Sequence, residues 1–268
     1  MDLDGYLRRI GYSGLIRPDL ATLRGVHRAH QLAVPFENLD VQLRRPVALD
    51  AEAAFDKIVR RRRGGWCYEL NGLMAEALKA LGFRVTRLCA GVMREHEGDA
   101  QLGNHLCLLV ELDEPYLVDV GFGGSLLEPL PLAAGARSDV PYDLCLSQLD
   151  DGHWRFVETT QSEPFSFDFR LGAADENLFA RHCQRLQTEA SSPFVQNLVV
   201  QRRTLETHLS LRGRVLTTLT AAGATKAVLR SAEELVATLR DRFDLDVPEA
   251  AALWPAICAR HEQVFARD

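Results

Sequence analysis

The chain has 268 residues, of which 47% are hydrophobic and 25% are charged, and its formal net charge is −6. These near-average proportions argue against disorder, collagen and coiled coil, and the acidic balance gives no electrostatic reason to expect nucleic acid or a membrane surface as a partner. No basic segment followed by an apolar one opens the sequence, and no run of about eighteen apolar residues occurs, so a cytoplasmic location is expected.

The six cysteines include no C-x-x-C pair, and no histidine pair has the spacing of metal ligands. The sequence therefore predicts neither a disulfide framework nor a zinc site, and no metal is expected. Five of the cysteines lie in mostly apolar segments and are interpreted as small buried hydrophobic residues. Cys67 is the exception.

The first eighty residues are predicted to be helical. Positions 19–31 follow an amphipathic pattern, Asp50 is placed to cap a second helix, and a third helix begins at or just before Cys67. In this third helix apolar residues recur at i, i+3 and i+4, and Gly82 supplies the stop signal. Its apolar face is expected to be buried, with Cys67 at the N-terminal end of that face.

From residue 83 the pattern changes to short β-branched or aromatic runs separated by Gly, Asp and Pro. The predicted strands are 83–92, 105–112, 116–122, 144–148 and 154–159. Strands that follow helices in this way indicate an α+β fold. The last region mixes strands near 196–204 and 207–217 with two helices, the first capped by Ser231 and the second at 250–265.

Cys67 lies in the segment R-G-G-W-C-Y-E-L-N-G at 63–72, directly after a glycine turn and at the start of a helix. A helix N-terminus carries partial positive charge and unpaired N–H groups, which favour a thiolate and can receive an oxyanion. A cysteine in this position is equally compatible with a buried, inert thiol.

A nucleophilic thiol needs a base, and the base needs a third group that fixes its tautomer. His105 opens an apolar strand, where it is either that base or a core histidine bonded to a backbone carbonyl. Asp119 lies within a second apolar run, where an unpaired carboxylate would be costly, so it requires a partner.

The simplest hairpin does not bring these two side chains together. If Asp113, Glu114 and Pro115 form the turn, the pairing of Leu112 with Tyr116 leaves His105 and Asp119 on one face but about four residues, roughly 13 Å, apart. If the two residues interact, a bulge, a strong twist or a different turn must close that gap.

Three segments, V-P-F-E-N-L-D at 34–40, the segment at 63–72, and V-D-V-G-F-G at 118–123, occur in this order with His105 between the last two. Together they resemble the arylamine N-acetyltransferase family, nearly end to end, although the similarity weakens after about residue 190. The resemblance implies a helical bundle at 1–82, a β-barrel at 83–187 and a C-terminal α/β lid at 188–268. The bundle and the barrel would then form a core similar to that of papain-like and transglutaminase enzymes.

The resemblance also implies roles for individual residues. Cys67 would be the acetyl-accepting nucleophile, His105 the base and Asp119 the orienting carboxylate, with acetyl-CoA as co-substrate and a small arylamine or hydrazine as acceptor. The acceptor pocket would be lined by Phe36, Phe122, Val92 and Phe194, whose alternative role is core packing. A short glycine loop would contact CoA through Gly121, Gly123, Gly124 and Ser125. In the matching motifs, Arg63 is placed to pair with Glu37.

Three other functions remain compatible with the sequence. One is a related amide synthase that takes its acyl group from a carrier. The second is a cysteine hydrolase of peptide or glutamine amides with the same triad. The third, a binding protein built on a catalytic scaffold, is hard to reconcile with an intact triad.

Overall fold

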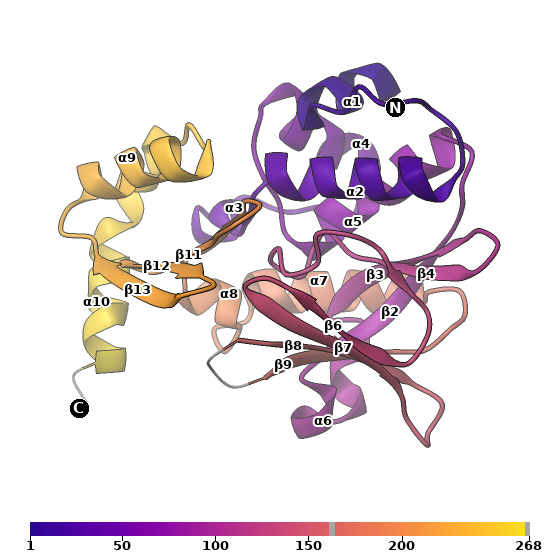
Figure 1. Cartoon of the computed structure of the whole chain (residues 1–268). Helices are drawn as coiled ribbons and strands as arrows, with labels where there is room; N and C mark the ends of the chain where they lie inside the picture. The colour runs from indigo at the N-terminus through magenta and orange to yellow at the C-terminus, as the bar shows by residue number, and fades with distance from the viewer. Residues whose placement is uncertain (161–163, 266–268) are drawn as a thin grey trace.

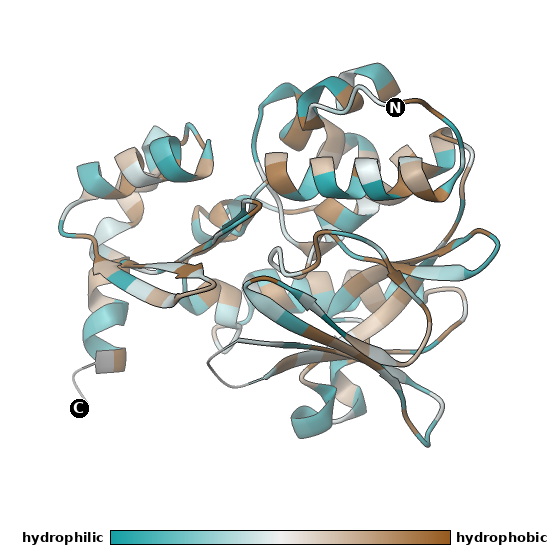
Figure 2. Cartoon of the chain, in the orientation of Figure 1, coloured by the Kyte–Doolittle hydropathy of each residue, from teal (hydrophilic) through white to brown (hydrophobic). Residues whose placement is uncertain are grey.

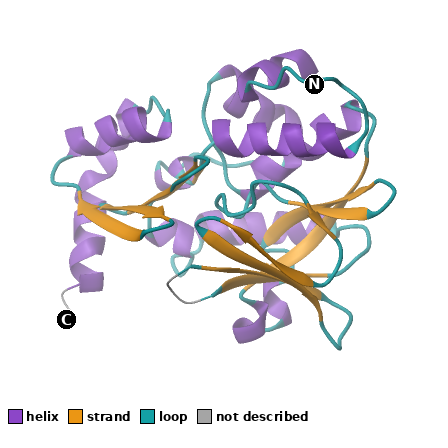
Figure 3. Cartoon of the chain, viewed as in Figure 1, coloured by secondary structure: helices purple, strands orange, loops and turns teal. Residues whose placement is uncertain are grey.

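The computed structural model describes residues 1–160 and 164–265. Helices of the N-terminal third pack beside a large curled sheet, and a smaller sheet with two further helices lies to one side (Figure 1). The chain is thus a mixed α/β protein, in agreement with the predicted α+β class. In Figure 3 the upper part of the molecule is helical, and most strands lie below it with further helices packed beside them.

The N-terminal helices begin where the sequence predicts. Asp19 and Asp50 cap α2 and α4 by accepting the backbone N–H groups of Thr22 and Ala53. The long third helix, α5, ends before Gly82, whose φ of +92° suits a residue without a side chain. The helical segments up to residue 80 are α1 (Leu3–Ile10), α2 (Leu20–Ala33), α3 (Leu39–Gln42), α4 (Ala51–Phe55), the π-helix η1 (Asp56–Arg60) and α5 (Cys67–Ala80).

The large sheet has eight strands in the order β5-β4-β3-β2-β9-β8-β7-β6, with antiparallel neighbours throughout. The strands are β2 (Arg84–Val92), β3 (His105–Glu111), β4 (Pro115–Val118), β5 (Leu130–Pro131), β6 (Gly135–Asp139), β7 (Tyr142–Gln148), β8 (Trp154–Thr159) and β9 (Phe165–Phe169). The region predicted as a barrel is therefore a curled sheet with β5 and β6 as its edges. It also contains helices that the sequence analysis missed, α6 (Arg94–Glu97), η2 (Asp99–Gln101) and α7 (Glu176–Thr188).

Strand β3 lies between two hydrophobic cores. Leu106, Leu108 and Val110 pack with the N-terminal helices, whereas Cys107 and Leu109 face the interior of the curled sheet. Burial on both faces explains why β3 is a continuous apolar run instead of an alternating one.

In Figure 2 hydrophilic and hydrophobic residues alternate along the helices, as expected where only one helix face is buried.

The turn of the β3–β4 hairpin lies one residue earlier in the chain than the simple register predicts. Glu111 pairs with Pro115 and Leu108 with Val118, so the register is shifted by two residues from the predicted pairing. The strand β4 ends at Val118 instead of continuing to Phe122. The shift makes His105 and Asp119 diagonal neighbours on one face, within reach of each other's side chains.

The C-terminal third forms a five-stranded sheet in the order β1-β10-β11-β12-β13. Its first strand comes from the N-terminal region, because Phe36 pairs with Gln201. The run predicted as one strand at 207–217 is split at Gly213, whose φ is +59°. The elements are β1 (Phe36–Glu37), α8 (Pro193–Gln196), β10 (Val199–Arg203), β11 (His208–Arg212), β12 (Val215–Thr220), β13 (Gly223–Val228), α9 (Ala232–Phe243), η3 (Pro248–Leu253) and α10 (Trp254–Phe265).

Candidate active site

Cys67 is the first residue of α5 and is almost fully buried, with 5% of its surface exposed. The turn that delivers it depends on Gly64, where an added Cβ would lie 2.1 Å from the carbonyl oxygen of Pro35. Glu69 accepts the backbone N–H of Trp66 at 3.2 Å, which closes the first turn of the helix. The sulfur therefore lies at the positive end of a well-anchored helix, as predicted.

A buried cluster of five charges fixes the loop before Cys67. Arg63 Nη2 lies 2.8 Å from Glu37 Oε1, so the predicted pairing of these two residues is confirmed. Lys57 Nζ lies 2.9 Å from Asp40 and 3.0 Å from Glu69. Burial alone would lower the pKa of Lys57, but the three surrounding carboxylates raise it above its ordinary value. The cluster joins β1, α3, η1 and α5 beneath the cysteine.

His105 lies between Asp119 and Cys67. Its Nε2 is 2.6 Å from Asp119 Oδ2, and both residues are buried. Burial lowers the pKa of His105, but the Asp119 carboxylate and a hydrogen bond with Cys67 raise it more, to about 10. Because Nε2 faces the carboxylate, Nδ1 is the ring nitrogen left for the thiol. At neutral pH the ring is an imidazolium, the form that stabilises a neighbouring thiolate.

Asn71, which the sequence analysis missed, holds the carboxylate in place. Its Nδ2 donates to Asp119 Oδ1 at 2.8 Å and to the Leu106 carbonyl at 2.6 Å, and its Oδ1 accepts the N–H of Val120 at 2.9 Å. The N–H of Gly121 also donates to Asp119 Oδ1, at 2.7 Å. Asn71 follows Cys67 by four residues in a helix, so the two lie on one face. This four-residue spacing is the feature of the sequence from which a role for Asn71 beside Cys67 could have been predicted.

Helix α2 secures the same segment from behind. Gln31 Nε2 lies 3.3 Å from the Asp119 carbonyl and 3.0 Å from the Leu126 carbonyl. The two ring nitrogens of His27 face the carbonyls of Leu127 and Asp119, at 3.1 and 3.2 Å. Burial is the main reason that the pKa of His27 is lowered to about 4, and a neutral imidazole donates through one nitrogen only. Gln31 therefore supplies the Asp119 carbonyl with a donor that does not depend on the His27 tautomer.

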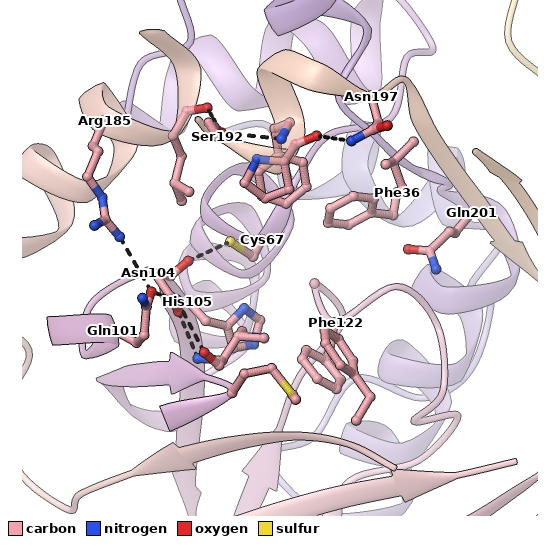
Figure 4. Close-up of a pocket in the computed structure, with 18 of the residues that line it drawn as sticks. Phe36, Cys67, Gln101, Asn104, His105, Phe122, Arg185, Ser192, Asn197 and Gln201 are labelled. Carbon is pink, nitrogen blue, oxygen red and sulfur yellow. Dashed lines mark hydrogen bonds between the residues drawn. The ribbon is translucent and has the colours of Figure 1, made fainter. Parts of the chain in front are cut away.

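A cavity of about 660 Å³ opens over Cys67 and His105. Phe36, Phe122, Val92 and Phe194, which were predicted to line the acceptor pocket, all line it. Figure 4 shows Phe36 and Phe122 on one side of Cys67 and Arg185 on the other. The lining also includes residues that the sequence analysis did not single out, Asn104, Phe165, Arg185, Gln201 and Arg212. Most of these come from α7 and the smaller sheet, whose position the sequence pattern does not reveal.

One residue of the predicted glycine loop lines the cavity, and the other three are buried beside it. Gly121 lines the cavity, and a Cβ there would lie 2.7 Å from Cys67 Cα. Gly123, Gly124 and Ser125 are buried, and they do not line the cavity. A Cβ on Gly123 would lie 2.4 Å from Gln201 Oε1, and one on Gly124 would lie 3.3 Å from Arg203 Cβ. Close approach to β10 and φ angles of +94° and +107° explain these two glycines.

Over residues 1–160 and 164–265, no three His, Cys, Asp or Glu side chains are grouped so that they could hold a metal ion. Within the same residues, no helix has the length and apolarity needed to cross a membrane.

The sequence matches a protein-family model and known proteins over most of its length. A family model described as N-acetyltransferase matches residues 19–252. The arylamine N-acetyltransferase of Mycolicibacterium smegmatis is 40% identical over 270 residues, covering 94% of this chain and 94% of that protein. The Mycobacterium tuberculosis arylamine N-acetyltransferase is 35% identical over 268 residues, covering 93% and 91% of the two chains.

Solved structures agree with these sequence matches. The structure of Mycobacterium marinum arylamine N-acetyltransferase in complex with CoA superposes with a TM-score of 0.87 at 34% identity, covering 98% of this chain and 99% of that chain. The arylamine N-acetyltransferase of Salmonella typhimurium gives a TM-score of 0.85 at 30% identity, covering 96% and 98%. The likeness therefore includes the C-terminal third, where the sequence motifs are weakest.

Proposed function

The chain belongs to the arylamine N-acetyltransferase family, and on that premise we propose that it transfers acetyl from acetyl-CoA to the nitrogen of an arylamine or hydrazine. The observation that carries the proposal is the position of His105, in contact with both Asp119 and Cys67 at the floor of an aromatic-lined cavity. A thiol, an imidazole and a carboxylate in this order can form and then break a thioester.

In the first half-reaction the Cys67 thiolate attacks the acetyl carbon of acetyl-CoA. The bond between that carbon and the CoA sulfur breaks, and the CoA thiolate leaves with the proton held by His105. The acetyl group is then a thioester on Cys67, and His105 is neutral. Asp119 keeps the ring oriented through both protonation states, because it accepts from Nε2.

In the second half-reaction the amine nitrogen attacks the same acetyl carbon. His105 takes a proton from that nitrogen, and the carbon–sulfur bond to Cys67 breaks. The products are the acetylated amine and the original thiolate–imidazolium pair. Backbone N–H groups at the start of α5 would donate to the oxyanion, a contribution of about 3 kcal/mol per donor in comparable sites.

The cavity suits both substrates. Phe36 and Phe194 form one aromatic wall, with ring centroids 6.1 Å apart, and Phe122 forms another beside His105. Such surfaces bind a flat aromatic amine. Arg185 and Arg212 line the cavity without a carboxylate partner among the described residues, so their guanidinium groups are available to the phosphates of CoA. Gly121, which lines the cavity, would be the member of the glycine loop that approaches the thioester.

The proposal includes the layout expected from the family. The helical region 1–82 and the strand region 83–187 would form the papain-like or transglutaminase-like core, and residues 188–268 would act as the lid that narrows the cleft. Several lid residues line the cavity, among them Phe194, Gln201, Ser210 and Arg212, which supports this role. All six cysteines are free, as a nucleophilic thiol requires, and a cytoplasmic location is part of the proposal.

Intact-protein mass after addition of acetyl-CoA without an amine tests the proposal. One acetyl group is expected on the wild type and on Cys145→Ala, but none on Cys67→Ala. Cys145 was predicted to be buried, but it is exposed and is therefore a suitable control. An arylamine chase should then discharge it. If Cys67 alkylates readily but takes no acetyl from acetyl-CoA, a carrier-bound acyl donor becomes the better explanation. Hydrolysis of glutamine or casein without CoA would instead indicate an amidohydrolase.

A further inference from the structure

Phe165 is an exposed aromatic residue on the wall of the cavity. It opens β9, and Phe165, Phe167 and Phe169 share one face of that strand because side chains alternate. Phe167 and Phe169 are buried in the core of the curled sheet, with 1% and 0% of their surface exposed, whereas Phe165 is 40% exposed. The row of rings thus continues past the edge of the core and into the cavity.

Phe165 is stacked on Phe122. Their ring centroids are 5.0 Å apart and their planes differ by 12°, which is a stacked arrangement. Phe122 is itself held from other directions by Phe167 at 4.8 Å and Phe156 at 5.9 Å, both edge-on. Two buried rings therefore fix the Phe122 ring, and the Phe122 ring in turn offers a rigid face to Phe165.

The stacked pair leads outward from the reacting groups. The His105 ring lies 5.4 Å from Phe122, and the next ring outward is Phe165. An amine that places its nitrogen at Cys67 and its first ring beside Phe122 extends toward Phe165 only if it carries a second ring or a bulky ring substituent. A single-ring amine ends before it.

We propose that Phe165 is a specificity-determining residue, which favours acceptors with two aromatic rings over acceptors with one. The inference rests on the proposed function and goes beyond it by assigning a size preference to a named side chain. A stacked ring adds about two- to tenfold to the preference for a two-ring acceptor. An acceptor with no ring gains nothing from it.

The test separates the two half-reactions. Cys67 is first acetylated with acetyl-CoA, and discharge of the acetyl-enzyme is then timed with 2-naphthylamine, aniline and methylhydrazine in turn. Phe165→Ala should slow discharge by 2-naphthylamine about two- to tenfold and leave the other two acceptors unchanged. Phe165→Tyr should restore the wild-type preference. Leu171→Ala, an exposed apolar side chain outside the cavity, is the matched control and should change nothing.

Because Phe165 is partly exposed, its truncation should leave the melting temperature nearly unchanged. Equal slowing with all three acceptors, or no slowing with any, would overturn the inference. Failure of the wild type to accept acetyl from acetyl-CoA would contradict the proposed function instead. The two failures are therefore distinguishable in one experiment.

Discussion

Asn71 donates its side-chain amide to Asp119 Oδ1 at 2.8 Å, so a residue of the helix that carries the thiol also sets the position of the carboxylate. Asn71→Ala should lower the free energy of unfolding by about 2–4 kcal/mol, because it strands the N–H of Val120 and the carbonyl of Leu106. It should slow acetylation of Cys67 on the order of 100-fold by misplacing the triad. Rapid-quench mass spectrometry measures the rate, with the exposed Asn177→Ala as control. A variant that is destabilised but fully active would show that Asn71 does not position Asp119.

Gly121 is expected to tolerate no side chain. An alanine Cβ would lie 2.7 Å from Cys67 Cα and 2.6 Å from Asn71 Nδ2, so the loop would have to move away from α5. Gly121→Ala should lower the free energy of unfolding by about 1–3 kcal/mol and slow Cys67 acetylation strongly. Gly135→Ala, where a Cβ meets nothing within 4 Å, should be neutral by urea denaturation and in the acetylation assay. Equal behaviour of the two variants would refute the close-approach explanation.

The positive charge of Lys57 compensates part of the negative charge of three buried carboxylates, so removing it should lower the free energy of unfolding. Lys57→Met leaves Glu37, Asp40 and Glu69 with Arg63 as the remaining buried cation of the cluster, and we expect a loss of about 3–5 kcal/mol in urea unfolding. Arg60→Ala breaks exposed ion pairs to Glu52 and Asp56 and should cost less than about 1 kcal/mol. A Lys57 variant as mild as Arg60→Ala would contradict this account.

Arg63→Ala should also destabilise the protein, because it removes a buried positive charge from beside two carboxylates. The molecules that remain folded should keep a reactive Cys67 thiol. The guanidinium pairs with Glu37 and Asp40 and is not among the residues that line the cavity. Alkylation of Cys67 by iodoacetamide, measured well below the melting temperature, should proceed at the wild-type rate. Loss of alkylation in the folded variant would assign Arg63 a direct part in the chemistry.

The His105–Asp119 pair should make stability depend on pH. The pKa of His105 is raised from 6.5 to about 10 in the folded state, so the folded chain holds this proton more tightly than the unfolded chain does. The contribution is complete below about pH 6.5 and is lost as the pH rises through 10. The difference in unfolding free energy between the wild type and His105→Gln should therefore shrink from pH 6.5 to 10. A difference that grew over this range would contradict the raised pKa.

Arg212→Ala should weaken acetyl-CoA binding specifically. Removing one guanidinium from a phosphate contact raises KM on the order of tenfold, whereas an acetyl thioester of a short thiol without phosphates should react as before. Arg230→Ala, outside the cavity, is the charge-matched control. If KM for the phosphate-free thioester rises equally, Arg212 acts on the shape of the cavity and does not bind phosphate.

Local signals in the sequence predicted much of this structure. Helix caps at Asp19, Asp50 and Ser231, the start of α5 at Cys67 and the apolar run of β3 all depend on neighbouring residues, and all are confirmed. The four aromatic and aliphatic residues expected at the acceptor pocket also line the cavity, although their binding role stays a prediction.

The features that were missed depend on distant parts of the chain. The two-residue shift in the β3–β4 hairpin and the roles of Asn71 and Gln31 follow from contacts across helices and strands. Helix α7 was missed inside a region dominated by strand patterns, and no local rule brings Arg185 on it toward the cysteine. Gly123 and Gly124 have φ angles of +94° and +107°, which favour glycine, and their contact with CoA stays a prediction.

The pairing of Phe36 with Gln201 has a consequence for how the protein is made. Translation is vectorial, so the ribosome completes Cys67, His105 and Asp119 long before it reaches β10, the strand that β1 needs as its neighbour. Leu39 likewise belongs to the C-terminal core, and the other buried residues of that core, from Leu198 onward, are synthesised later. The emerging chain therefore contains the Cys67 thiol before the C-terminal residues that line the cavity over it have been synthesised. A product terminated ahead of Val199 would expose that thiol to oxidants and to unintended acyl donors.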